Sequence, residues 1–203
     1  RNNASTWSRL DAHDNTPTVI QLLGNKEIAI KKFLSKFKPH EGFKGFNINM
    51  GCPSPQVINL GLGCAMIKRI SKAKKLISIF RDNGYPVSIK MRLGMNKYEK
   101  DSKVYLNLID GADPDFFIVH ARHGTQSYDE KADYSVFSEC VKIGKPIVAN
   151  GDIDSKEKVE LLKSNGVSGV MIGREAVKNP AIFNKIKDLP CPSKEKLIEE
   201  YLE

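Results

Sequence analysis

The sequence predicts an α/β fold of the TIM type, a (β/α)8 barrel, and three observations support this fold class. Short apolar segments alternate with segments of helical periodicity, an order typical of β-α units and a parallel sheet. The predicted strands are apolar throughout, as expected of strands that are covered on both faces. Polar residues follow nearly every strand at its C-terminal end, where a barrel has its active site. No G-x-G-x-x-G follows a strand, which disfavours a doubly wound dinucleotide-binding sheet.

Six strands are predicted from short apolar runs, at Thr18–Leu23, Phe46–Asn49, Val87–Met91, Phe116–His120, Pro146–Asn150 and Gly169–Ile172. Helices are predicted between them from apolar residues at helical spacing, at Ile28–Phe37, Ala65–Phe80, Lys100–Ile109, Tyr134–Val141 and Lys156–Leu162, with a last short helix after the sixth strand. Asn83-Gly84 is a typical stop signal for the second of these helices.

Six strands are fewer than the eight of a closed barrel, and an open arc of buried-type strands would leave two exposed edges. The chain begins without a methionine, at a polar stretch over residues 1–16. We therefore expect this sequence to lack the first two β-α units. Near the other end, Pro190-Cys191-Pro192 breaks the chain and Ser193 caps a new helix. We expect residues 1–190 to form a partial barrel that is the catalytic domain, and residues 191–203 to begin a helical domain.

The composition is that of a globular protein with a basic balance, because 32 Lys and Arg face 24 Asp and Glu for a net charge of +8. This charge is compatible with a nucleic-acid partner, although lysine-rich surfaces are also common as solvated faces. No apolar run is long enough for a membrane span. The four cysteines and four histidines have no zinc-site spacing, so no metal is expected, and unpaired cysteines fit a reducing cytoplasm.

The loops after the last two predicted strands have the features of a phosphate site. One strand ends in Asn150-Gly151-Asp152 and the other in Gly173-Arg174. Loops at this position of a barrel commonly bind phosphate through backbone N–H groups, and Arg174 adds a forked positive charge. The alternative is two ordinary βα turns with Arg174 in solvent.

Lys90 and His120 lie at the ends of two apolar strands, where burial of a charge is costly unless a partner meets it. A cationic pair facing a phosphate-anchored ligand suits an isoalloxazine ring, whose reduced form carries negative charge. Gln21 could contact the pyrimidine edge of such a ring, although a single strand-end glutamine is more often structural. The alternative for Lys90 is a side chain that extends to solvent.

Cys52 lies between Gly51 and Pro53 at the tip of an apolar strand, a position that suits chemistry. The alternative is a small buried hydrophobic residue, which is what most free cysteines are. A free thiol has a pKa of about 8.5 and is mostly protonated at neutral pH, so it can donate a proton to carbon beside a hydride donor. Arg122, His123 and the loop from Thr125 to Tyr128 would line the mouth and meet substrate, or His123 is simply solvated.

With these residues identified, the sequence resembles the tRNA-dihydrouridine synthases. The most specific match is Asn47-x-Asn49-x-Gly51-Cys52-Pro53, then Val57 and Gly63-Cys64. Further matches follow in the family's order: Val19-x-Gln21-Leu22-x-Gly24, Ile89 to Gly94, Val119 to Arg122, Ala149 to Ile153, and Gly169 to Arg174 with Asn179-Pro180. The resemblance runs from Val19 to Phe183. The family's first strand, with an Ala-Pro-Met flavin contact, is absent, and His123-Gly124 departs from its usual pattern.

The resemblance implies FMN-dependent reduction of tRNA uridines to 5,6-dihydrouridine, with NADPH as reductant. It implies that reduced FMN gives hydride to C6 of the uracil and that Cys52 protonates C5. The residues expected to contact the flavin ring are Gln21, Lys90 and His120, and those on the phosphate side are Asn150, Gly151, Asp152, Gly173 and Arg174. The residues expected to bind substrate are Asn49, Arg92 and Arg122. In the family, tRNA lies across a barrel and a helical domain.

Two other functions stay open from the sequence. A free-pyrimidine oxidoreductase of the dihydroorotate or dihydropyrimidine type also places Asn and Cys-Pro near a catalytic loop. A test of whether free uracil or orotate is reduced would distinguish this function from reduction of tRNA. A non-catalytic RNA-binding remnant without flavin is the other. The modified uridine and the oligomeric state are not indicated by the sequence.

Overall fold

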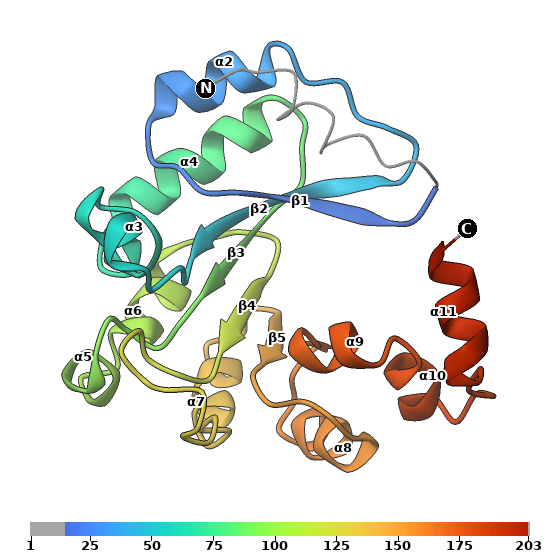
Figure 1. Cartoon of the computed structure of the whole chain (residues 1–203). Helices are drawn as coiled ribbons and strands as arrows, with labels where there is room; N and C mark the ends of the chain where they lie inside the picture. Colours follow the sequence, from blue (N-terminus) through green and yellow to red (C-terminus); the bar gives the residue numbers. More distant parts are fainter. Residues whose placement is uncertain (1–14, 203) are drawn as a thin grey trace.

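The computed structural model describes residues 15–202, which form one parallel sheet with helices along one side. The six strands are neighbours in chain order, β1 to β6. Their bounds are β1 Thr18–Leu22, β2 Phe43–Met50, β3 Val87–Met91, β4 Phe117–His120, β5 Ile147–Asn150 and β6 Gly169–Met171. The sheet curls (Figure 1), with α2, α4, α6, α7 and α8 along its convex side. This is a TIM-barrel arrangement of β-α units, here as an open arc of six strands.

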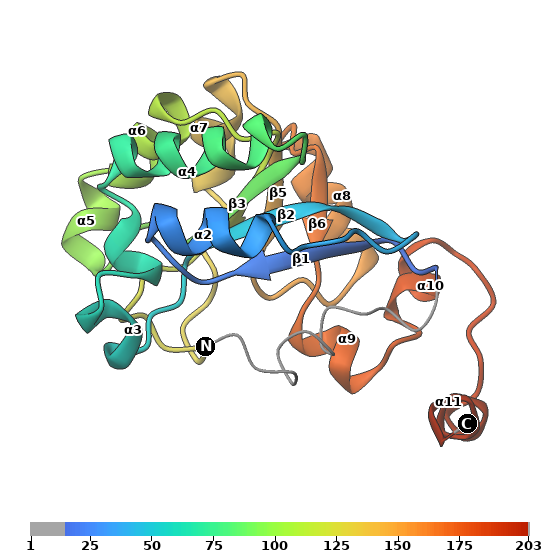
Figure 2. The same ribbon diagram turned by 90° about the horizontal axis from the view of Figure 1, so that it is seen from above.

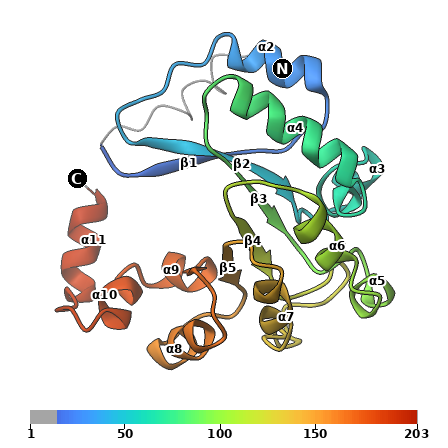
Figure 3. The ribbon, with the colours of Figure 1, turned by 180° about the vertical axis from the view of Figure 1, so that it is seen from behind.

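The helices follow the strands in alternation, as the sequence predicts. Their bounds are α2 Glu27–Leu34, α3 Pro55–Asn59, α4 Ile70–Asp82, α5 Lys97–Asp101, α6 Val104–Gly111, α7 Val136–Lys142, α8 Lys156–Ser164, α9 Arg174–Lys178, α10 Ile182–Ile186 and α11 Lys194–Leu202, with a 3-10 turn, η1, at Gly63–Met66. Figure 3, from behind, shows α2 and α4 together over β1 and β2. No helix in residues 15–202 combines the length and the apolar character that a membrane crossing needs.

The core lies between the convex face of the sheet and these helices. Helix α4 shows why it packs there, because its buried residues Ala73, Leu76, Ile77 and Phe80 recur at helical spacing. Phe46 of β2 lies at the centre of an aromatic cluster, with the rings of Phe33, Phe37, Phe43, Phe80 and Tyr85 at 5.0–5.8 Å from its own. These contacts fix the strands whose ends carry the polar residues.

All six predicted strands are confirmed, but two predicted helices are wrong in part. The helix expected over Ala65–Phe80 begins only at Ile70, because Gly63 to Met66 form a 3-10 turn that buries Cys64. The helix expected over Lys100–Ile109 is two helices, α5 and α6, separated at Lys103, which has a positive φ of 54°. Helix α3, with Pro55 in its first turn, was not predicted.

The C-terminal segment leaves the sheet after β6. Helices α9 and α10 follow one another closely, and Figure 2 shows α11 at the end of a longer connection, away from the sheet. The predicted helix after Ser193 is confirmed, and the Ser193 hydroxyl accepts from Lys196 N at 3.2 Å as an N-cap does. Whether residues 191–203 begin a separate domain stays a prediction.

Candidate functional site

The polar strand ends form one continuous rim because the strands pair in register. Gln21 of β1 lies beside Asn47 of β2, and Asn49 lies beside Lys90 of β3. His120 of β4 lies beside Asn150 of β5. Parallel strands place all their C-terminal ends at the same edge, so residues separated by up to about 130 positions meet there.

Two adjoining cavities open at this rim. The smaller, about 510 Å³, lies over the ends of β5 and β6 and is lined by Asn150, Gly151, Asp152, Gly173 and Arg174 among others. The larger, about 860 Å³, is lined by Gln21, Asn49, Cys52 and Arg92 and continues over the apolar concave face of the sheet. Lys90, His120, Tyr128 and Met171 line both. Both volumes are in the range of roughly 300–1,000 Å³ that is typical of ligand pockets.

Asn49 shapes the loop that carries Cys52. Its side-chain oxygen Oδ1 accepts hydrogen bonds from the backbone N–H groups of Gly51, at 3.1 Å, and Cys52, at 2.6 Å. This local turn directs the chain away from β2 directly after the strand ends. Cys52 consequently lies half-buried at the edge of the larger cavity.

The segment with Gly63 and Cys64 also contacts the loop that carries Cys52. Cys64 N donates to the Cys52 carbonyl at 3.0 Å, and the Cys64 thiol donates to the Gly51 carbonyl at 3.2 Å. Gly63 makes this approach possible, because it has a φ of +57° and a Cβ there would lie 2.2 Å from the Cys52 carbonyl oxygen. Burial raises the pKa of the Cys64 thiol to about 12, so it stays a protonated donor. Cys64 is therefore a support for the Cys52 loop.

Side-chain amides connect the first three strands on the concave face. Gln21 Nε2 donates to Asn47 Oδ1 at 2.7 Å, and Asn49 Nδ2 donates to Gln21 Oε1 at 2.9 Å. Asn47 Nδ2 in turn donates to the Ser88 hydroxyl at 2.8 Å. These contacts orient Gln21 and Asn49 at the rim. Asn47 belongs to the signature that resembles the family, but no role was predicted for it or for Ser88, although strand alternation places Asn47 on the same face as Asn49.

Lys90 and Arg92 bring positive charge to the centre of the rim. The pKa of Lys90 is lowered, first by burial and then by the neighbouring Arg92 charge. Within the described residues Lys90 forms no ion pair with a carboxylate. Arg92 is 4% exposed, and its guanidinium donates to the His123 carbonyl at 2.8 Å and to the Tyr128 hydroxyl at 3.2 Å. Lys90 is thus a cation facing the cavities without an anionic partner from these residues.

His120 lies between the two cavities and is uncharged at neutral pH. Burial, followed by the charges of Arg92, Lys90 and Arg122, lowers its pKa to about 3. The Tyr128 ring stacks near it, with 6.3 Å between ring centroids. Gly151, with a φ of +120°, lets the β5 loop approach closely, because a Cβ there would lie 3.0 Å from His120 Cδ2. The cationic pair expected at this position is therefore one cation and one neutral ring.

Arg122 does not line the mouth, and this expected position is wrong. Its side chain is fully buried, and it forms an ion pair with Asp152 through Nη1 at 2.8 Å and Nη2 at 2.5 Å. It also donates to the Glu130 carbonyl from Nε, at 3.0 Å, and from Nη2, at 2.5 Å. A guanidinium that is satisfied inside the protein has no face left for substrate. Tyr128 of the same loop is the residue that lies at the mouth.

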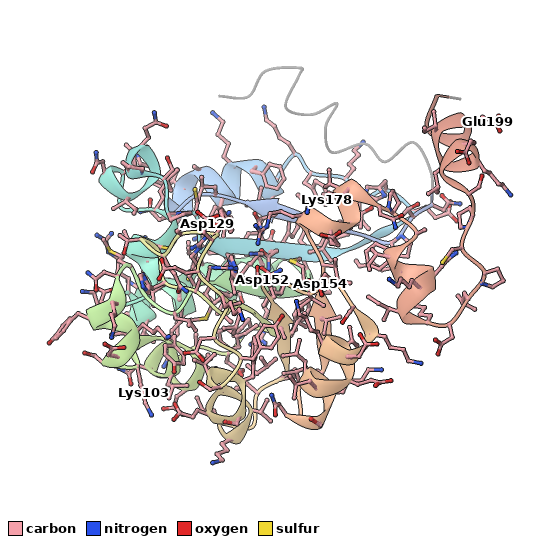
Figure 4. The ribbon with its side chains drawn as sticks, turned by 60° about the horizontal axis from the view of Figure 1, so that its bottom comes forward. Lys103, Asp129, Asp152, Asp154, Lys178 and Glu199 are labelled. Atoms are coloured by element: carbon pink, nitrogen blue, oxygen red, sulfur yellow. The ribbon has the colours of Figure 1, made fainter. Side chains whose placement is uncertain are left out.

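The expected phosphate-side residues line the smaller cavity, but their side chains have different contacts. Asp152 carries a carboxylate that accepts from Arg122, from Ala132 N at 3.0 Å and from Arg174 at 2.7 Å. An ionised carboxylate cannot donate to phosphate, so its side chain holds the two arginines. Figure 4 shows Asp152 and Asp154 close together with Lys178 of α9 nearby. Asn150 Nδ2 donates to the Met171 carbonyl at 2.9 Å and connects β5 to β6.

Arg174 and Gly173 are exposed at the open side of this cavity. The Arg174 guanidinium lies over the Tyr128 ring, 4.3 Å from its centroid. The lining also includes Lys158 and Lys178. Since Arg174 pairs with Asp152 through one nitrogen, its other donors remain for an anion. Within residues 15–202, no group of His, Cys, Asp or Glu is arranged to hold a metal ion.

Comparisons with known proteins agree on one family. The model of the dihydrouridine synthase (Dus) family matches residues 1–202. A probable tRNA-dihydrouridine synthase from Helicobacter pylori (strain ATCC 700392 / 26695) is 35% identical over 90% of this chain and 58% of its own length. Probable tRNA-dihydrouridine synthase 2 from Bacillus subtilis (strain 168) is 33% identical over 85% of this chain and 54% of its own length. The chain thus spans little more than half the length of these relatives.

Solved structures show the same fold at low identity. The dihydroorotate dehydrogenase (DHODH) of Eimeria tenella, solved in complex with ferulenol, has a TM-score of 0.57 at 13% identity and covers 81% of this chain and 53% of its own. A tryptophan synthase α-subunit from Pyrococcus furiosus has a TM-score of 0.56 at 18% identity over 87% of this chain and 68% of its own. These likenesses show the TIM-barrel fold alone. With a family model matched over nearly its whole length, the chain belongs to the dihydrouridine synthase family.

Proposed function

We propose that this chain carries the catalytic site of an FMN-dependent oxidoreductase that reduces uridines in tRNA to 5,6-dihydrouridine, with Cys52 as the proton donor. The observation that carries the proposal is the position of Cys52. Its thiol lies at the edge of a cavity that also contains Lys90, His120 and Arg92, in a loop held by Asn49 and Cys64. Family membership supports this reaction, and the relatives' names include tRNA as substrate.

The residues at the rim fit a bound FMN. Lys90 offers an ammonium group without a carboxylate partner within the described residues, and His120 offers a neutral ring that lines both cavities. Gln21, which also lines the larger cavity, offers an amide whose orientation is held by two asparagines. The smaller cavity offers cationic side chains at its open side, Arg174 and Lys178, for a phosphate group. Bound FMN, reduced by NADPH, would supply the hydride that adds to C6 of the uracil.

The residues of the chain would then bind the base and complete the reduction. Asn49 and Arg92 line the larger cavity together with Cys52 and would orient the uracil ring. The Cys52 thiol would transfer its proton to C5, so that one hydride and one proton together saturate the C5–C6 bond. The resulting thiolate would be protonated again from solvent, because Cys52 is half-buried. A uridine in folded tRNA has to be extruded from its stack to reach this depth.

The proposal includes tRNA as the macromolecular partner and the cytoplasm as the location. The net charge of +8 gives the chain an attractive field for a polyanion. Helix α11, set away from the sheet, is proposed as the beginning of a helical tRNA-binding domain. The domain division at residues 190 and 191 is part of this proposal.

The first test is the visible absorption spectrum of the purified chain, followed by identification of any released chromophore and by titration with FMN. Retained or rebound FMN supports the assignment of the rim. The tRNA assay then measures dihydrouridine formed with NADPH, with free uracil and orotate as competing substrates. Turnover of the free bases without turnover of tRNA would contradict the proposal, and RNA binding without flavin binding would indicate a non-catalytic function.

Two substitutions separate chemistry from cofactor binding. Cys52→Ala should retain FMN affinity and lose most dihydrouridine formation, by about 100-fold or more, as expected for loss of a general acid. Cys191→Ala, at an exposed cysteine outside both cavities, is the matched control and should keep full activity. Arg174→Ala should instead weaken FMN binding, and unchanged flavin affinity would contradict the phosphate assignment.

A further inference from the structure

Arg122 uses every donor of its guanidinium inside the protein. A guanidinium has five N–H donors and no acceptor. The Nε–H group donates to the Glu130 carbonyl at 3.0 Å, and Nη2 donates to the same carbonyl and to Asp152 Oδ2, both at 2.5 Å. Nη1 donates to Asp152 Oδ1 at 2.8 Å, and its remaining hydrogen faces His120 Nε2 at 3.3 Å. Arg122 therefore contacts Nε2 of His120, the histidine that lines both cavities.

This contact determines where the imidazole proton lies. Because Arg122 only donates, His120 Nε2 has to accept, and a neutral ring with Nε2 as acceptor carries its proton on Nδ1. We infer that Arg122 is a positioning residue that holds His120 as the neutral Nδ1–H tautomer, and that Asp152 in turn holds Arg122. The tautomer is then set by the loop after β4 and the loop after β5 together, before any ligand binds.

The charged groups around His120 favour the same state. Arg92, Lys90 and Arg122 oppose a proton on the ring, and Asp152 is the carboxylate that favours one. Asp152 is itself neutralised by Arg122 and Arg174. The net surroundings are cationic, so the imidazolium form is disfavoured. A doubly protonated ring would also place two donors, on Nη1 and on Nε2, against each other.

The packing of the ring gives the Nδ1–H group a direction. The Cδ2 and Nε2 edge faces Gly151 and Arg122, since a Cβ at Gly151 would lie 3.0 Å from Cδ2 and 3.4 Å from Nε2. The opposite edge, which contains Nδ1, points away from these two contacts, and since His120 lines both cavities we assign this edge to them. His120 consequently presents a hydrogen-bond donor there. The ligand atom opposite has to be an acceptor, such as a carbonyl oxygen or an unprotonated ring nitrogen; identifying that ligand with a flavin rests on the proposed function.

The test is a long-range ¹H–¹⁵N spectrum of the histidine rings in the whole ¹⁵N-labelled chain, without ligand, at neutral pH. His120 should show a protonated Nδ1 and an unprotonated Nε2. Its signals are assigned from their loss in His120→Gln, with His123→Gln as the matched assignment control. An Nε2–H tautomer, an imidazolium or an even mixture of tautomers would overturn the inference. Because no ligand is added, this result is independent of whether the chain binds FMN.

A variant tests the role of Arg122 itself. Arg122→Lys keeps a positive charge but cannot serve Asp152 and His120 together, so His120 should change to a mixture of tautomers, and the affinity for added FMN should fall by about tenfold. An unchanged tautomer in Arg122→Lys, with the fold confirmed by circular dichroism, would overturn the positioning role. If this variant does not fold, two spectra still test the inference. One is that of the unsubstituted chain, and the other is that of Asp152→Asn, in which Arg122 loses its carboxylate partner. A chain that shows the tautomer but binds no FMN would contradict the proposed function alone.

Discussion

The loop that carries Cys52 illustrates how single residues determine this site. Asn49 accepts from two successive backbone N–H groups, and Cys64 holds two carbonyls of the same loop from the opposite side. Each contact satisfies a backbone group that would otherwise be costly to bury. The cysteine that we propose as the acid is therefore held in place by two neighbours, neither of which donates the proton in the proposed reaction.

Gly63 provides the sharpest residue-level prediction. Gly63→Ala should destabilise the chain by on the order of 3 kcal/mol, because the added Cβ meets the Cys52 carbonyl at 2.2 Å and the φ of +57° is strained for alanine. Gly84→Ala is the matched control, since Gly84 has a φ of +76° and open space around it. Gly84→Ala should lower the unfolding free energy by only about 1 kcal/mol. Urea unfolding measures both, and equal losses would contradict the role of Gly63 in the loop.

His120 should make the stability of the chain depend on pH. Its folded-state pKa of about 3 lies below its unfolded value, which is about 6.5. Between these values the unfolded chain binds a proton that the folded chain does not, so stability should fall as pH falls from 6.5 toward 3. Carboxylates also titrate in this range, and the measurement is therefore the difference in unfolding free energy between the unsubstituted chain and His120→Gln. If the unfolding free energies of the two chains change with pH in parallel, the pKa of His120 is not lowered in the folded state.

At the scale of elements, the strands were predictable and several helix limits were not. The strands are short apolar runs, and their signal is local. The apolar periodicity predicts a helix from Ala65 onward. In the structure Gly63–Met66 form a 3-10 turn because Gly63 packs against the Cys52 loop, and α4 begins only at Ile70. The break between α5 and α6 at Lys103 has no glycine or proline to mark it. A left-handed residue that packing imposes is not visible in the sequence pattern.

The start of α5 supports a prediction at this scale. The Asn96 side chain accepts from Glu99 N at 2.9 Å, and Glu99 accepts from Met95 N at 2.8 Å. Asn96→Ala should therefore cost about 1 kcal/mol of unfolding free energy. Ser54→Ala is the matched control, because Ser54 precedes α3 without a side-chain capping hydrogen bond. This substitution should cost only about a few tenths of a kcal/mol of unfolding free energy. Equal midpoints in urea would show that the Asn96 cap contributes nothing.

At the scale of the whole molecule, the curled sheet brings together residues from β1 to β6 that no local signal connects. Lys90 of β3, His120 of β4 and Tyr128 of the loop after β4 line both cavities. The comparisons show family membership over residues 1–202, within a chain that spans 54–58% of its relatives' length. The expected absence of two β-α units stays a prediction.

Binding of tRNA should depend strongly on salt if the proposed partner is right. The net charge of +8 favours contacts to phosphates, and each such contact releases counterions. We expect the affinity for tRNA to fall at least about tenfold between roughly 50 and 200 mM salt. Fluorescence anisotropy with labelled tRNA measures it, with circular dichroism at each salt concentration as the control for folding. A salt-independent affinity would exclude a mainly phosphate-based interaction.

The sequence by itself determined the fold class, the six strands and the chemical types at the strand ends, because apolar periodicity and polar strand ends are local patterns. Only the tertiary structure decided how those side chains are used. Arg122 and Asp152, expected at substrate and phosphate, lie 30 residues apart and satisfy each other. His120 is neutral because it is buried and because three cations surround it. Hydrogen-bond partners and burial depend on segments far apart in the chain, and the residue types alone do not specify which donors remain free.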